Sequence, residues 1–243
     1  MTNRPSQISP QIYARVGGVL YLIIIVIGFC GQFFVRDRLV VSGDANATAN
    51  NIIASESLWR LQLASDLLLL LCAIVVMLVL YVLLKPVNKN LALLSVFFAM
   101  LSFPIEAVSK LFLYAGLFFA GNFQYLKAFQ PEQLHAMTYV LLKLHDYGFA
   151  IDLIFFGCAC LLNGYLLFRS GYFPRVLGVL IFIAGLSYLA NSFTLLLAPT
   201  LSGTVFVVLV LALIGELSLA LWLTLKGVNL ALWEKRQHES QRV

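Results

Sequence analysis

Apolar runs long enough to cross a lipid bilayer dominate this sequence. One of them, residues 67–84, contains no charged or amide side chain. A helix needs roughly 20 predominantly apolar residues to span the hydrocarbon core. Backbone polar groups find no hydrogen-bond partners in lipid, so a membrane-spanning run must form a helix or part of a closed barrel. The apolar runs of this sequence lack the period-two alternation of barrel strands. We therefore predict an all-α protein, a polytopic transmembrane helical bundle.

Short polar segments divide the chain into six apolar stretches. We expect six membrane-spanning helices within one transmembrane domain, residues 1–243, at about residues 14–35, 58–84, 91–120, 139–168, 176–198 and 204–225. The turns at residues 85–89 and 169–175 are basic and each holds a proline, which ends a helix. The longest polar connection is residues 36–57, of which residues 45–57 are expected to be helical.

The distribution of basic residues predicts the orientation in the membrane. Six spans place both termini on one side, and cytoplasmic segments carry an excess of Lys and Arg. The terminal side holds ten of these residues: Arg4, Arg15, Lys85, Lys89, Arg169, Arg175, Lys226, Lys235, Arg236 and Arg242. The opposite side holds four: Arg36, Arg38, Arg60 and Lys127. We therefore expect both termini in the cytoplasm, the 36–57 connection outside, and a location in the bacterial cytoplasmic (inner) membrane.

Composition and motifs exclude several classes of function. Only 11% of the residues are charged, against about 25% in soluble domains, and 61% are hydrophobic. The net charge of +5 does not indicate a nucleic-acid partner, because the basic residues stand at the ends of the apolar segments. The chain has no C-x-x-C, H-E-x-x-H or G-x-S-x-G motif. We expect no metal and no cofactor, and the motifs assign no catalytic residue.

Polar residues inside the expected spans are the main functional signal. A charged group at mid-membrane costs on the order of 2.5–3.5 kcal/mol, so it is kept only when it is paired, hydrated or used. If the polar faces of different helices converge, they would line a common cavity. The candidates for such a ligand-binding cavity are Asp66, Glu106, Lys110, His145, Asp152, Asn191 and Glu216.

Helical spacing predicts which of these groups can meet. Glu106 and Lys110 are four residues apart and can pair along one helix. Lys143 and Asp146 are three apart and can neutralise each other in the same way. His145 and Asp152 are seven apart and share a helix face. The structural alternative is that the Glu106–Lys110 pair ties helices together and that His145 is a hydrogen-bonded packing residue.

The balance of charge sharpens the prediction. Five carboxylates in the expected spans face only two lysines, so up to three of them lack a cationic partner. Each unpaired carboxylate must be protonated, reach water or hold a cation.

Three functions remain open. The first is a non-enzymatic membrane protein that binds or moves a small ligand, a lipid or a proton through a polar intramembrane cavity. The second is an intramembrane enzyme acting on a lipid or quinone-like substrate, with His145 as acid or base beside Asp152 or Glu216. The third is a structural or regulatory partner that uses the outer connection or the basic tail. The lipid bilayer is a partner in each case, and convergence of the polar residues would favour the first two.

Four segments resemble a known family. They are residues 43–52 (GDANATANNI), 80–88 (LYVLLKPVN), 169–178 (RSGYFPRVLG) and 215–229 (GELSLALWLTLKGVN). Together they are similar to the bacterial membrane-protein family called domain of unknown function 4386, and the resemblance covers nearly the whole chain. The resemblance implies a polytopic membrane protein, and it supplies no activity or catalytic residues.

Overall fold

The described residues form helices joined by short connections, as the apolar runs predict. The computed structural model describes residues 9–121 and 124–240, without the side chains of residues 204–206. Its long helices are α1 (Pro10–Cys30), α4 (Glu56–Leu84), α5 (Lys89–Ala120), α6 (Pro131–Ser170), α7 (Arg175–Leu197) and α9 (Leu209–Leu225). Arg4 and Arg242, which were counted for orientation, lie outside the described residues.

The number of membrane-crossing helices agrees with a polytopic bundle. In the described part of the chain, five helical segments are each long and apolar enough to cross a membrane. A sixth is obtained if α9 and α10 (Leu230–Ser240), which meet at an angle of 102°, are taken as one span. α9 is preceded by the short helices η3 (Pro199–Leu201), α8 (Ser202–Val205) and η4 (Phe206–Val208).

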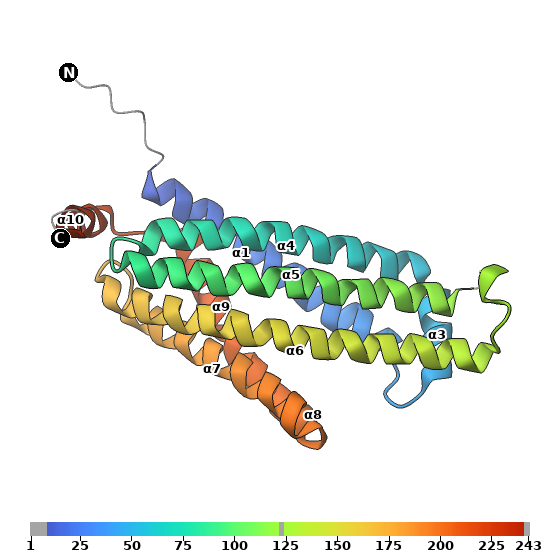
Figure 1. Cartoon of the computed structure of the whole chain (residues 1–243). Helices are drawn as coiled ribbons and strands as arrows, with labels where there is room; N and C mark the ends of the chain where they lie inside the picture. Colours follow the sequence, from blue (N-terminus) through green and yellow to red (C-terminus); the bar gives the residue numbers. More distant parts are fainter. Residues whose placement is uncertain (1–8, 122–123, 241–243) are drawn as a thin grey trace.

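The long helices form a closed ring. α1 packs on α4, α4 on α5, α5 on α6, α6 on α7, and α7 on α9, which returns to α1. α4, α5 and α6 run along the length of the bundle, and α10 lies across one end (Figure 1). A ring of this kind can enclose a space between its helices.

Local sequence sets the ends of the helices. The Asn88 side chain caps α5 by accepting a hydrogen bond from the Leu91 amide at 3.0 Å. Gly171 ends α6 with a φ of 77°, a left-handed conformation that glycine adopts without a steric penalty. α5 continues through Pro104 without a break.

One end of the bundle is held together by side chains from distant parts of the chain. The Gln11 side chain, at the start of α1, donates to the Lys226 carbonyl just after α9. Trp233 of α10 and Tyr172, between α6 and α7, both donate to the carbonyl of Leu83. Burial raises the pKa of the Tyr172 hydroxyl, which keeps it a donor. The first described helix therefore begins where α9 ends.

The polar connection folds onto the opposite end. α1 continues as a π-helical segment, η1 (Gly31–Arg36), and a short helix, α2 (Asp37–Leu39). α3 (Ala45–Ala54) follows, with Asp44 accepting a hydrogen bond from the Ala47 amide at 2.9 Å. α3 packs against α5 and α6. The helix expected in residues 45–57 is thus present, although it ends earlier.

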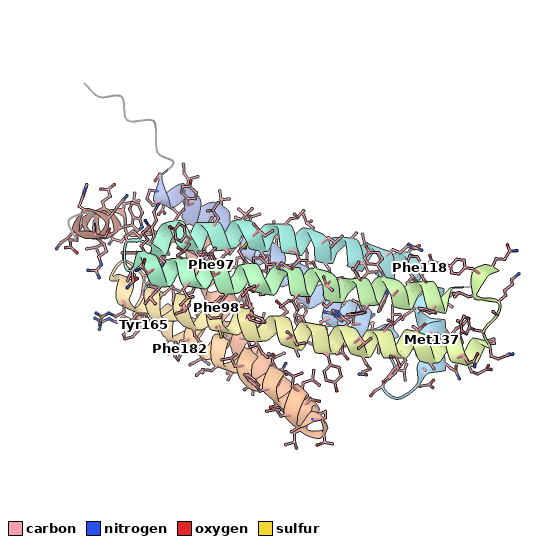
Figure 2. The ribbon with its side chains drawn as sticks, in the orientation of Figure 1. Phe97, Phe98, Phe118, Met137, Tyr165 and Phe182 are labelled. Carbon is pink, nitrogen blue, oxygen red and sulfur yellow. The ribbon has the colours of Figure 1, made fainter. Side chains whose placement is uncertain are left out.

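The outer surface of the bundle is apolar. Phe97, Tyr165 and Phe182 point away from the bundle in Figure 2, with 58%, 47% and 41% of their surfaces exposed. An apolar exterior of this extent fits contact with lipid.

Glycines bring α6 and α7 into close contact. A Cβ atom added at Gly164 of α6 would lie 2.6 Å from the Phe182 amide nitrogen and 2.8 Å from the Gly178 carbonyl oxygen. These are backbone atoms, so a methyl group would have to push the helices apart. Small residues at helix contacts are typical of membrane bundles.

We predict that Gly164→Ala destabilises the protein by about 1–3 kcal/mol, the usual cost of overpacking. Gly28→Ala is the control, since its nearest neighbour would be Leu69 Cδ1 at an ordinary 3.8 Å. Thermal unfolding in detergent would measure both. Equal melting temperatures for the two variants would contradict the close contact between α6 and α7.

Candidate functional site

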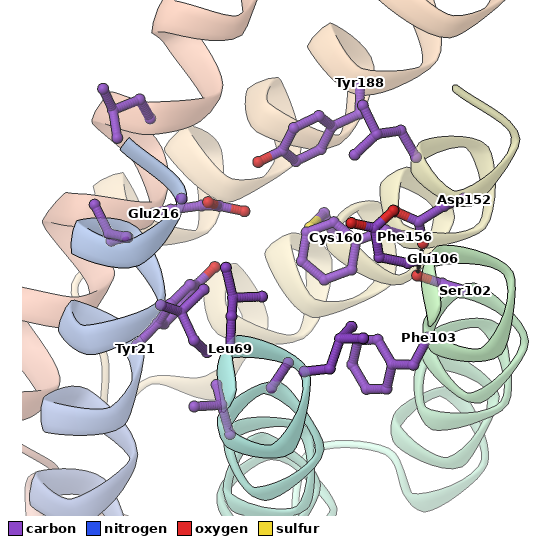
Figure 3. Close-up of a pocket in the computed structure, with 18 of the residues that line it drawn as sticks. Tyr21, Leu69, Ser102, Phe103, Glu106, Asp152, Phe156, Cys160, Tyr188 and Glu216 are labelled. Atoms are coloured by element: carbon purple, nitrogen blue, oxygen red, sulfur yellow. Dashed lines mark hydrogen bonds between the residues drawn. The ribbon is translucent and has the colours of Figure 1, made fainter. Parts of the chain in front are cut away.

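The ring of helices encloses a cavity of about 320 Å³. Every helix of the ring contributes to its lining, and most of the wall is apolar, with Phe103 and Phe156 among the largest side chains. Five of the seven candidate residues line this cavity: Asp66, Glu106, Lys110, Asp152 and Glu216. Figure 3 shows Glu106, Asp152 and Glu216 around it, on three different helices. We call it the central cavity.

Lys110 is held between two carboxylates. Its Nζ lies 2.6 Å from Glu106 Oε1, one turn away on α5, which confirms the pair predicted from spacing. It also lies 3.2 Å from Asp66 Oδ2 on α4. All three side chains are at most 9% exposed. The cluster therefore satisfies Lys110 and links α4 to α5.

Asp66 has a second partner on its own helix. Gln62 Nε2 donates to Asp66 Oδ1 at 2.6 Å. Gly31 makes room for this amide, because a Cβ atom there would lie 2.1 Å from Gln62 Nε2. Gly31 begins the π-helical segment, and such segments are frequent at functional sites.

Asp152 meets a hydroxyl group and makes no ion pair with any described residue. The Ser102 hydroxyl of α5 donates to Asp152 Oδ1 on α6. Asp152 is only 5% exposed. The charge balance predicted that up to three carboxylates lack a cationic partner, and Asp152 is one carboxylate without an ion pair in the described part of the chain.

Glu216 occupies a separate part of the central cavity. It is 9% exposed, and its Oε1 is buried without a hydrogen-bond partner among the described residues. The hydroxyl groups of Tyr21 (α1) and Tyr188 (α7) point toward its carboxyl group (Figure 3). Three helices thus meet at one incompletely satisfied carboxyl group.

His145 and Asn191 lie in a different place. They line a second cavity of about 360 Å³, toward the end covered by the 36–57 connection. His145 is 2% exposed, and Arg36 Nη1 lies 2.9 Å from its Nε2. Arg36 lines both cavities.

The contacts of His145 define its protonation state. The guanidinium of Arg36 is always charged and only donates, so Nε2 must accept. Nδ1 then carries the hydrogen, and it faces the carbonyl oxygen and the hydroxyl of Ser109 at 3.3 and 3.2 Å. His145 is therefore a neutral, fully hydrogen-bonded residue.

The other predicted pair is also present. Lys143 Nζ lies 3.1 Å from Asp146 Oδ2, and both side chains are about half exposed. This pair lines the second cavity and contributes nothing to the central one.

The sequence did not predict roles for Tyr21 and Tyr188, or the contact of Arg36 with His145. A tyrosine within an apolar span is a usable signal, because its hydroxyl requires a polar partner there. The sequence contained this signal at Tyr21 and Tyr188, but it could not identify the shared partner Glu216.

Metal binding finds no support in the described residues, where no three His, Cys, Asp or Glu side chains are placed to share an ion. The polar groups that line the central cavity are carboxylates, hydroxyls, the amides of Gln32 and Asn163, the Lys110 amine and the Arg36 guanidinium. They fit hydrogen bonding to an organic ligand and proton exchange.

The fold and cavity define a polytopic helical membrane protein. The chain belongs to the family described as domain of unknown function 4386, whose model matches residues 16–227. It is also similar to an uncharacterized protein of Archaeoglobus fulgidus, with 30% identity over 166 residues, or 68% of this chain and 82% of that protein. The similarity therefore extends to an archaeon. No solved structure matches the chain with significance.

We predict that Lys110→Met destabilises the protein by about 3–5 kcal/mol, because Asp66 and Glu106 would be left as buried carboxylates without a cation. The matched control is Lys143→Met, which breaks a half-exposed pair worth less than about 1 kcal/mol. Thermal unfolding in detergent would compare them.

The triple variant Asp66→Asn/Glu106→Gln/Lys110→Met removes the charges of the cluster together and should recover much of the loss. Equal unfolding of Lys110→Met and Lys143→Met would contradict the assignment of Lys110 as a buried ion-pair centre.

Proposed function

We propose that this protein binds a small amphiphilic ligand, a lipid or another molecule with a polar head, in the central cavity. The observation that carries the proposal is the convergence of Asp66, Glu106, Lys110, Asp152 and Glu216 on one mostly apolar cavity. Ligand sites are commonly concave and apolar, with a few polar groups that orient the ligand.

The energetic cost of the polar groups supports a role in binding. Each charged group in the bundle costs on the order of 2.5–3.5 kcal/mol. The ion pairs of Lys110 offset this cost for Asp66 and Glu106. Asp152 and Glu216 have no ion pair in the described part of the chain, so packing alone does not account for them.

The enzymatic alternative gains less support. It places His145 as acid or base beside Asp152 or Glu216. His145 instead contacts Arg36 and Ser109 and lines the second cavity. The nitrogen atoms of its ring are both engaged, so it is not poised toward a substrate in the central cavity.

The partner alternative relied on the outer connection and the basic tail. Both segments contact this chain itself: α3 packs on α5 and α6, and Trp233 of α10 donates to Leu83. Ligand binding is therefore the function that the geometry favours.

We place the protein in the cytoplasmic membrane with both termini inside. The excess of Lys and Arg on the terminal side supports this orientation. In this orientation the 36–57 connection and the second cavity lie toward the outer end of the bundle.

We predict that Ala73→Phe abolishes ligand retention, because Ala73 lines the central cavity and a phenyl ring would fill part of it. The control is Ala64→Phe on the same helix, where the side chain is exposed on the outside. Native mass spectrometry of protein released from membranes would detect retained molecules as mass adducts.

The wild type and Ala64→Phe should carry the same adduct, and Ala73→Phe should lose it while remaining folded. The proposal fails if the wild type retains nothing, or if all three proteins carry identical adducts.

We predict that a reporter fused after residue 243 lies in the cytoplasm and that one fused after residue 54 lies outside. Alkaline phosphatase is active only outside the cytoplasmic membrane and green fluorescent protein fluoresces inside it. In a bacterial host, the 1–54 fusion should therefore give phosphatase activity and the full-length fusion should give fluorescence. The reverse pattern would contradict the orientation.

A further inference from the structure

Glu216 is a buried carboxyl group of the central cavity that makes no ion pair with any described residue, whereas Asp66 and Glu106 both pair with Lys110. Its Oε1 is fully buried and has no hydrogen-bond partner among the described residues. The carboxyl group faces the cavity, and the hydroxyls of Tyr21 and Tyr188 point toward it from two other helices (Figure 3). A ligand that donates hydrogen bonds would complete this arrangement.

The charged residues that line the cavity indicate whether the ligand's head group is cationic or anionic. The described residues that line it include four carboxylates, at Asp66, Glu106, Asp152 and Glu216, against the two cations of Lys110 and Arg36. Lys110 and Arg36 balance the charges of two of these carboxylates, and the other two add negative charge when they ionise. An anionic head group would therefore meet no unbalanced cation in the described lining, whereas a cationic one can pair with a carboxylate.

The number and type of hydrogen-bond acceptors around Glu216 indicate which cationic head group fits there. A primary ammonium group has three N–H donors and no acceptor. Glu216 Oε1 and the two tyrosine oxygens supply three acceptors. A hard metal ion takes six or more oxygen ligands, which this part of the wall does not provide.

The neighbouring wall fits an organic substituent. Phe156 and Leu213 line the cavity together with Tyr188. The rings of Phe156 and Tyr188 lie 5.5 Å apart, centroid to centroid. Aromatic side chains add a favourable cation–π contribution beside an ammonium group, and they bury an apolar body.

We propose that Glu216, Tyr21 and Tyr188 bind the primary ammonium group of an amine whose apolar substituent lies against Phe156 and Leu213. This inference rests on the proposed function and specifies the head group that the central cavity recognises. Glu216 supplies the negative charge, and the tyrosines fix the position of the carboxyl group and accept from the ligand.

The test uses 2-phenylethylamine as the probe, with the full chain in lipid nanodiscs. Equilibrium binding of the radiolabelled amine should be saturable for the wild type. The neutral analogue 2-phenylethanol has the same aromatic body and should not compete at a tenfold excess. Glu216→Gln should weaken binding at least about tenfold, as expected for loss of a buried charged partner.

Two further variants separate recognition from folding. Tyr188→Phe keeps the ring and the charge of Glu216 but removes one acceptor, so it should weaken binding by about threefold. Glu234→Gln changes an exposed glutamate on α10 and should leave binding unchanged. Melting temperatures would identify any variant that fails to fold. If Glu216→Gln does not fold, the affinity of Tyr188→Phe for the amine tests the proposal instead.

Three results would overturn the proposal: no saturable amine binding, competition by 2-phenylethanol equal to that of the unlabelled amine, or full affinity in folded Glu216→Gln. The mass adduct sensitive to Ala73→Phe tests the proposed function independently. If that adduct persists while amine binding is absent, only the ammonium site is wrong. If both are absent, the ligand-binding function itself is wrong.

Discussion

The contact of Lys110 with Asp66 and Glu106 fixes much of this bundle. Lipid tails are as apolar as the outward-facing side chains, so the hydrophobic effect alone does not choose how membrane helices face one another. Polar contacts and close backbone approaches must make that choice. The ion pair between Lys110 and Asp66 sets the rotation of α5 against α4, and the glycines of α6 and α7 set their mutual distance. The carboxylates face the central cavity as a consequence.

The π-helical segment after α1 connects the two polar regions. Gly31, at its start, leaves space for the Gln62 amide that donates to Asp66 in the central cavity. Arg36, at its end, reaches His145 and lines both cavities. A π-turn takes an extra residue and so turns the side chains that follow to another face of the helix. Because of the π-helical segment, residues that follow α1 contact both the Asp66 region and His145.

Features whose geometry is local could be predicted from the sequence. The long apolar runs predicted the all-α bundle, and spacing along one helix predicted the pairs Glu106–Lys110 and Lys143–Asp146. His145 and Asp152 share a helix face, as their spacing predicts, but seven residues of rise, about 10 Å, separate them along α6. Contacts between helices depend on how each helix is rotated about its own axis, and a single sequence does not reveal these rotations. Asp66 beside Lys110, and the tyrosines beside Glu216, required the structure.

The two parts of the central cavity differ in how far the protein satisfies its own charges. Lys110 pairs with both Asp66 and Glu106, and Gln62 donates a further hydrogen bond to Asp66, so the protein itself supplies partners to both carboxylates. Glu216 is not fully satisfied, since its buried Oε1 has no donor in the described part of the chain. Leaving such an atom unsatisfied costs about 1–3 kcal/mol, more for a charged group. A ligand that donates a hydrogen bond to Oε1 removes this penalty when it binds. A ligand without a donor does not, so the carboxyl group favours ligands that carry one. The Lys110 cluster thus stabilises the fold, while Glu216 provides the recognition.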